Sequence, residues 1–203
     1  MRDLHQKMSP DEILETFKAG NKRFLEGKLK FRDHLVDVNR TALGQTPHAI
    51  VLGCIDSRKP AEVIFDKGLG DIFNARVAGN FVNTDILGSI EFACKVSGSK
   101  LILIMGHSDC GAVKAAVDDV KLGNITPMLE NLKPAVDSVI EIRGKATSED
   151  KSFVAHVAKQ NVLLNMEKIL QHSPIIAEMV EKKEVKIAGC MYSLETGVVD
   201  FYD

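Results

Sequence analysis

The sequence has almost no net charge and no long apolar run. Its 26 lysine and arginine residues against 28 aspartate and glutamate residues leave a formal net charge of −2 at pH 7. A protein that binds nucleic acid or an acidic membrane surface needs an excess of positive charge, so neither class is indicated. No apolar run reaches the length of about 20 residues that spans a bilayer, and the N-terminus contains no apolar core of signal-peptide length. We therefore expect a cytoplasmic protein without membrane or nucleic-acid partners.

Internal repeats and low-complexity segments are also absent, which gives no sign of a repeat protein or of long disordered regions. The length of 203 residues suits one domain with a sizeable buried core. The only candidate linker, residues 143–152, joins two predicted helices and is too short to imply a second domain. We predict a single domain over residues 1–203, with an N-terminal helical arm (1–46) and an α/β core (47–203).

The sequence contains four cysteines but no Cys-x-x-Cys pair, so it lacks the usual ligand spacing of a structural zinc site. A disulfide framework is not expected either, because the cytosol keeps thiols reduced. Cys94 lies on the apolar face of a predicted helix, and Cys190 lies in a predicted strand. We interpret both as small core residues. Cys54 and Cys110 remain to be explained, since each follows an apolar run at a predicted strand end.

Short apolar runs alternate with helical patterns along the chain. Ser9, Pro10 and Glu12 form a helix-start signal, and an amphipathic helix is predicted after it, whereas residues 27–46 are polar and predicted to be irregular. Strands are predicted over 49–54, 71–77, 100–106 and 185–192, and helices around 60–66, 84–97, 109–120, 125–143 and 151–171. The last residues predict an edge strand after a turn at 195–197. The pattern predicts an α/β fold with about four parallel strands, a C-terminal edge strand, and helices on both faces.

Three metal-ligating side chains follow two of these predicted strands. Cys54 ends one strand, and His107 and Cys110 follow another. Ligands of open α/β sheets bind beyond the carboxyl ends of the strands, so the three side chains are expected to meet. Two cysteines and a histidine form a known catalytic zinc set that leaves the fourth position open. The alternative is that His107 caps a helix while both cysteines fill the core, which leaves the matched strand-end positions unexplained.

The motif Cys54-x-Asp56-Ser57-Arg58, followed by His107-x-x-Cys110-Gly111, resembles the signature of the β-class carbonic anhydrases. The resemblance extends in order over essentially the whole chain, including residues 9–24, 60–82 and 85–93. It implies that Cys54, His107 and Cys110 bind one zinc ion per chain. It also implies a zinc lyase that hydrates CO2 reversibly to bicarbonate and a proton by zinc-hydroxide attack.

Asp56 and Arg58 match the family's catalytic dyad. Residues two apart on an extended segment point the same way, so we predict an ion pair that keeps Asp56 ionised. In the family the aspartate can also move onto the zinc as a fourth ligand in a closed state. Because two thiolates cancel the formal charge of the ion, we predict a bound water less acidic than in a three-histidine site. Activity should therefore rise above neutral pH.

The resemblance also implies substrate-binding residues and a dimer. Gln45 matches a glutamine that holds substrate in one subtype, Phe73 an aromatic wall, and Gly111 a backbone N–H that faces the substrate. Phe92 stands where many relatives have tyrosine, so any role of that hydroxyl is absent. The chain has no tryptophan, so the inhibitory second bicarbonate site of one subtype is not expected. The family implies a homodimer with pockets at its interface, or a homotetramer.

Two other functions remain open at the level of sequence. One is a hydrolase of carbonyl sulfide or carbon disulfide on the same zinc site, which pocket shape would decide. The other is a zinc-stabilised binding protein without turnover, against which the presence of Asp56, Arg58 and Gln45 argues. The remaining histidines are interpreted as surface or helix-packing residues, and the sequence does not choose a proton shuttle among them: His5, His34, His48, His156 and His172.

Overall fold

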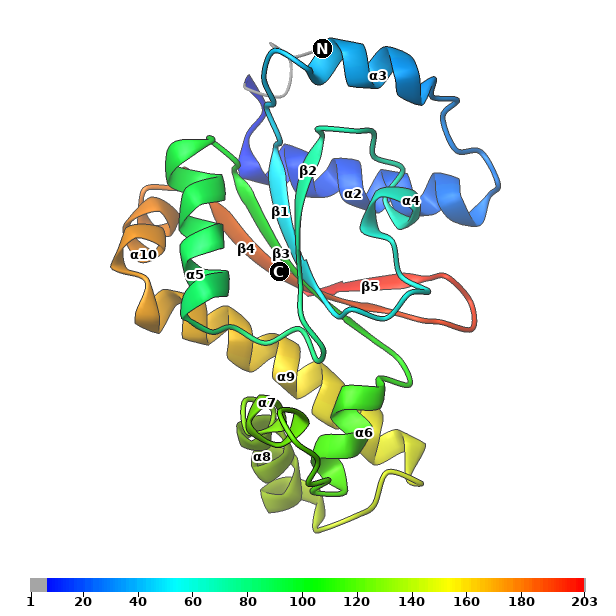
Figure 1. Cartoon of the computed structure of the whole chain (residues 1–203), viewed down its shortest axis with the longest axis vertical. Coiled ribbons are helices and arrows are strands. Elements are labelled where there is room, and N and C mark those ends of the chain that lie inside the picture. The colour runs from blue at the N-terminus through cyan, green and yellow to red at the C-terminus, as the bar shows by residue number, and fades with distance from the viewer. Residues whose placement is uncertain (1–6, 203) are drawn as a thin grey trace.

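A five-stranded sheet forms the centre of the computed structural model, which describes residues 7–202. The strand order is β2-β1-β3-β4-β5, with β1 to β4 parallel and β5 antiparallel to β4. This confirms the predicted parallel sheet with a C-terminal edge strand (Figure 1). The strands are β1 (Ala49–Gly53), β2 (Ile72–Arg76), β3 (Leu101–His107), β4 (Lys186–Tyr192) and β5 (Val199–Tyr202).

Helices cover both faces of the sheet, as the continuous apolar runs of the central strands require. They are α2 (Pro10–Leu25), α3 (His34–Thr41), α4 (Ala61–Ile64), α5 (Thr84–Glu91), the π-helical turn η1 (Phe92–Val96), α6 (Gly111–Val117), α7 (Ile125–Leu129), α8 (Lys133–Arg143), α9 (Lys151–His172) and α10 (Pro174–Glu181). Alternate strand residues divide between the two layers. Val51 and Leu103 pack with α2 and α4, whereas Leu52 and Ile104 pack with η1, α9 and α10. Among the described residues, none of these helices combines the length and hydropathy needed to cross a membrane.

The predicted start of α2 is confirmed atom by atom. The Ser9 hydroxyl accepts a hydrogen bond from the N–H of Glu12 (3.2 Å), and the Glu12 carboxylate accepts one from the N–H of Ser9 (2.7 Å). The apolar face of α2 buries Ile13 and Phe17 against the sheet. A Cβ at Gly20 would lie 2.0 Å from the Phe65 carbonyl oxygen. Glycine is therefore needed there for α2 to cross the end of α4.

Three local predictions were wrong. The segment 27–46 contains the helix α3, capped by Asp33, although none of its residues is buried. The single helix predicted over 125–143 is two helices, α7 and α8, with Pro134 in the first turn of the second. Helix α10 is missing from the predicted helices, the last of which ends at residue 171, although Ser173 and Pro174 form a normal helix start.

Candidate metal centre

The carboxyl ends of β1 and β3 bring the three predicted ligands together. The two strands are neighbours with Gly53 opposite Met105, so Cys54 leaves the sheet beside the last residues of β3 (Figure 1). His107 is the last residue of β3, and Cys110 is the N-cap of α6. A sharp turn at Asp109, whose φ is +55°, directs the chain from the strand into that helix. This is the edge of the sheet at which ligands bind in parallel α/β folds.

The ligand atoms of Cys54, His107 and Cys110 all lie within 4.8 Å of one another. The two sulfur atoms are 4.0 Å apart, and no disulfide links them. The three residues are only 4%, 1% and 1% exposed. Buried polar atoms normally have hydrogen-bond partners. Here three buried ligand atoms converge without fully satisfying one another's hydrogen bonds, which suits them to bind a metal ion.

His107 is oriented for ligation through one defined nitrogen. Its Nδ1 lies 2.8 Å from the Ser108 carbonyl oxygen, which can only accept, so Nδ1 carries the proton. The lone pair is therefore on Nε2, and this buried atom has no hydrogen-bond partner among the described residues. Metal-ligating histidines show this arrangement, because a carbonyl on the other ring nitrogen fixes the tautomer.

The two thiols share a proton. The Cys110 S–H donates to Cys54, and this bond, opposed by burial and assisted by the N–H of Gly79 at 3.4 Å, lowers the pKa of Cys54 far below its ordinary value. The same bond, together with burial, raises the pKa of Cys110. Both shifts favour a metal-free site with one thiolate and one thiol. Cys94 and Cys190 behave differently, since burial raises the pKa of each to about 12, in keeping with their predicted place in the core.

Asp56 and Arg58 form the predicted ion pair beside the cluster. The Arg58 Nε donates to Asp56 Oδ1 at 3.0 Å and Nη2 donates to Oδ2 at 2.8 Å. The backbone N–H of Arg58 also donates to Oδ1 (2.9 Å), so the segment is a turn and not the extended segment expected. These hydrogen bonds from Arg58, partly opposed by burial, hold the pKa of Asp56 well below its usual range.

Side chains from β2 and α9 fix the loops around the cluster. Arg76 donates to the Cys54 carbonyl (2.9 Å) and to the Asp56 carbonyl (2.6 Å). Asn161 of α9 donates to the Gly79 carbonyl at 2.9 Å, which places the Gly79 N–H next to Cys54. Arg76 and Asn161 therefore hold the loops beside the cluster in place.

Lys59 is a residue that the sequence interpretation missed. Its side chain is buried beneath the cluster with 2% exposure, packs against Gly53 and donates to the Met105 carbonyl at 2.9 Å. Burial lowers its pKa to about 8, while the nearby thiols of Cys190 and Cys54 oppose the shift. A lysine next to a proline after a strand looks like a surface residue, so no sequence signal could have revealed it.

The predicted substrate residues do not all meet within one chain. Gly111 is the first residue of α6, adjacent to Cys110. Gln45 is exposed and precedes β1, and Phe73 is half-buried opposite Ile50 near the amino end of that strand. Since β1 rises by about 3.3 Å per residue, its amino end lies about 13 Å from the end at which Cys54 leaves it. The roles of Gln45, Phe73 and Gly111 stay predictions.

The other histidines have the predicted kinds of environment. His48 is 4% exposed and packs edge-on against Phe17 of α2, with ring centroids 6.0 Å apart. His34, His156 and His172 are exposed. His5 lies outside the described residues.

Comparison with known proteins gives a consistent family. The family model "Carbonic anhydrase" matches residues 49–199. "Carbonic anhydrase 2" of Mycobacterium tuberculosis is 35% identical over 195 residues, which cover 93% of this chain and 91% of that protein. The structure of the β-carbonic anhydrase CcaA superposes with a TM-score of 0.77 at 26% identity, covering 90% of this chain and 94% of that one. One of two tetrameric β-carbonic anhydrases from Sordaria macrospora gives a TM-score of 0.72 at 28% identity, covering 82% and 89%.

Proposed function

The chain belongs to the β-carbonic anhydrase family and is a carbonic anhydrase, and on that basis we propose that one zinc ion, held by Cys54, His107 and Cys110, serves its reversible hydration of CO2. The proposal depends on one observation above all. Three buried ligand atoms lie within 4.8 Å of one another, and one of them, His107 Nε2, has no other partner among the described residues.

The donor set fits zinc in chemistry and in spacing. Zinc accepts cysteine sulfur and histidine nitrogen in tetrahedral sites, with a zinc–sulfur distance of about 2.3 Å. Two sulfurs of a tetrahedral site are then about 3.8 Å apart, close to the 4.0 Å between Cys54 and Cys110. With only three protein ligands, the fourth position is open for a small molecule. Bound zinc lowers the pKa of water, which makes hydroxide available near neutral pH.

Asp56 and Arg58 are proposed to orient the reacting oxygen. The Arg58 fork and the Arg58 N–H occupy Asp56 from one side, so the carboxylate stays ionised and its position is fixed. An ionised carboxylate can only accept hydrogen bonds, so it selects an oxygen that carries a proton at the open side of the cluster. That hydrogen bond would direct the free lone pair of the same oxygen toward the carbon of CO2. If Arg58 releases Asp56, the carboxylate is free to reach the fourth position, which is the closed state expected from the family.

The substrate pocket is proposed to form between two subunits. In one chain Gln45 and Phe73 lie at the amino end of β1, away from the cluster. Strand β2 is an edge of the sheet, and the apolar side chains of α3 and its flanks are bare, with Leu35 76% and Leu43 97% exposed. Bare apolar side chains and an open edge strand are features of a surface that a partner covers. A homodimer, or a homotetramer made of two such dimers, would cover these side chains and this edge strand.

We also propose a single working unit and a cytoplasmic location. The sheet joins residues from 49 to 202, and α2 packs on it from the predicted arm (1–46). The four cysteines of the chain are free, and two of them belong to the cluster that must stay reduced to bind metal. A reducing compartment suits that chemistry.

Metal analysis and stopped-flow CO2 hydration on the same samples test the proposal. We expect about one zinc per chain in the wild type, and loss of both zinc and activity in Cys54→Ser. Cys94→Ala, which changes a buried thiol outside the cluster, should keep both. Zinc with no CO2 hydration at about pH 8.5 would instead indicate a non-catalytic zinc protein. Parallel assays with carbonyl sulfide and carbon disulfide address the sulfur hydrolases, which the carbonic anhydrase names of the relatives do not favour.

A further inference from the structure

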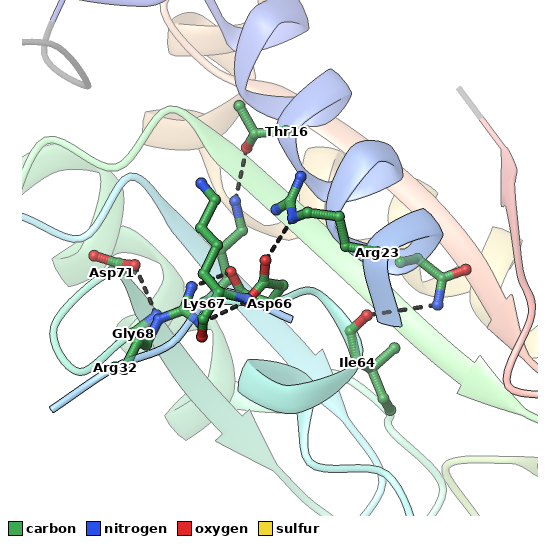
Figure 2. Close-up of polar contacts among 10 residues, drawn as sticks. Thr16, Arg23, Arg32, Ile64, Asp66, Lys67, Gly68 and Asp71 are labelled. Atoms are coloured by element: carbon green, nitrogen blue, oxygen red, sulfur yellow. Dashed lines mark hydrogen bonds and ion pairs between the residues drawn. The ribbon is translucent and has the colours of Figure 1, made fainter. Parts of the chain in front are cut away.

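A second cluster of charged groups lies where α2 meets the loop after α4 (Figure 2). At its centre is the Asp66 carboxylate, whose side chain is 0% exposed. It accepts hydrogen bonds from Arg23 Nε (2.5 Å), Arg32 Nη1 (2.5 Å) and the backbone N–H of Lys30 (3.2 Å). Asp66 is therefore fully used as a counter-charge for these two arginines.

Lys67, the next residue, is a lysine without a carboxylate partner. Its Nζ donates to Thr16 Oγ1 at 2.7 Å and lies 4.2 Å from the centre of the Phe17 ring. The Thr16 hydroxyl proton is donated to the Ile13 carbonyl (2.7 Å), so Thr16 offers Lys67 a lone pair, as the dashed line in Figure 2 shows. Within residues 7–202 no carboxylate forms an ion pair with Lys67.

This environment favours the neutral amine. Burial lowers the pKa of Lys67 to about 7, with Asp71 and Asp66 opposing the shift and Arg23 and Lys30 adding to it. Near neutral pH a large share of such an amine is neutral, against about 0.1% of an ordinary lysine with a pKa of about 10.4 at about pH 7.4. A neutral amine is a nucleophile, and a buried lysine is a common way of obtaining one.

Lys67 lines a cavity that also contains cationic groups with N–H donors left unused by the described residues. Lys67 lines a surface cavity of about 390 Å³, together with Arg23, Lys30, His48 and Asp71. Arg23 uses only Nε for Asp66, and its two Nη groups make no hydrogen bond to the described part of the chain. The Lys30 ammonium likewise makes none to those residues. An anion formed on Lys67 would therefore meet the positive charges of Arg23 and Lys30, opposed by the carboxylate of Asp71.

We propose that Lys67 is a modification site for CO2 and reversibly forms a carbamate. The nitrogen lone pair attacks the carbon of CO2, an N–C bond forms, and one C–O π pair moves onto oxygen. The nitrogen then loses one proton to solvent, so a neutral amine and CO2 give an anionic carbamate and a proton. The remaining N–H can stay bonded to Thr16 Oγ1, while Arg23 and Lys30 face the new carboxylate across the cavity. The site is separate from the zinc cluster and goes beyond CO2 hydration.

Trapping of the carbamate tests the proposal on the zinc-loaded protein. The protein is equilibrated with ¹³C-labelled CO2 and bicarbonate at about pH 7.4, esterified with a trialkyloxonium reagent, and analysed by peptide mass spectrometry. We expect the labelled ester on Lys67 at a level at least about tenfold above that on Lys159. Lys159 is a matched internal control, because it also lies over an aromatic ring (Tyr202, 4.5 Å) but is exposed.

Substitution and pH supply two further readouts. Lys67→Arg keeps a positive charge but cannot form the carbamate, so the ¹³C carbamate resonance should disappear. At fixed total inorganic carbon, labelling of Lys67 should be half-maximal near pH 7, whereas labelling of an exposed lysine keeps rising to about pH 10. Absence of label from Lys67, or a bound bicarbonate resonance that yields no trapped ester, would overturn the proposal. Zinc content and CO2 hydration, measured on the same samples, separate such a failure from failure of the proposed function.

Discussion

The shared proton of Cys54 and Cys110 predicts how zinc binding depends on pH. In the metal-free site the thiolate form of Cys54 is favoured, because its sulfur accepts hydrogen bonds from the Cys110 S–H and the Gly79 N–H. Only the Cys110 proton then has to leave when both sulfurs bind zinc as thiolates. Two independent cysteines with an ordinary pKa of about 8.5 would release nearly two protons at about pH 7.

The number of protons sets the slope of affinity against pH. Release of one proton strengthens zinc binding about tenfold between about pH 7 and about pH 8, which corresponds to about 1.4 kcal/mol. Release of two would strengthen it up to about a hundredfold over the same range, or about 2.7 kcal/mol. We predict the smaller slope for the wild type, because the 4.0 Å contact between the sulfurs removes one of the two protonation steps.

Competition with a chromophoric chelator measures the affinity, and calorimetry in two buffers of different ionisation enthalpy counts the protons directly. Metal-free protein is prepared by chelation, and its fold is checked before zinc is returned. Cys94→Ala should give the same proton count as the wild type, because that thiol is buried away from the cluster. A count near two at about pH 7 would refute the shared proton and the electrostatic description of the site.

Four more outcomes are expected. Arg58→Lys removes the two-point contact with Asp56, so kcat should fall at least about tenfold with zinc content unchanged. Asp66→Asn leaves two arginines around a neutral amide, so the free energy of unfolding, measured with urea, should fall by about 3 to 5 kcal/mol. In Lys67→Met the free energy of unfolding should rise less with pH than in the wild type. The pKa of Lys67 is about 7 in the folded protein and about 10.4 in the unfolded chain, so between those pH values the unfolded wild type binds more protons than the folded one. Leu35→Asp, on the bare face of α3, should shift sedimentation toward the monomer while the melting temperature of the monomer stays nearly constant.

The sheet and the metal cluster were predictable because both follow from local patterns. Apolar runs such as 101–105 are buried on both faces, which is why they lack alternation and indicate a parallel sheet. Parallel strands end at one edge, so two strands that each end in a metal-ligating residue place those residues together. This rule places Cys54 and His107 together without any knowledge of long-range contacts, and the pairing of β1 with β3 agrees with it.

The missed features depend on contacts far apart in sequence. Helix α3 is short, lies in a mostly polar segment, and buries none of its residues in its own chain. Lys59 is buried because the chain after β1 folds back under Gly53. Asp66 is buried because Arg23 of α2 and Arg32 of the segment after α2 both pack against it. Charged side chains are almost always exposed, so a sequence gives no reason to place these inside.

The arrangement of the site explains why one chain is insufficient for the proposed pocket. The ligands and the Asp56–Arg58 pair lie at the carboxyl end of β1, whereas Gln45 and Phe73 lie toward its amino end, about 13 Å away. A strand cannot shorten, so its two ends cannot line one pocket. A two-fold partner docked on the β2 edge can bring its own amino end beside this chain's carboxyl end, and the bare side chains of α3 offer the apolar surface for that contact. The monomer–dimer equilibrium and the CO2 hydration rate should therefore change together in Leu35→Asp, while zinc content, which needs only one chain, should not.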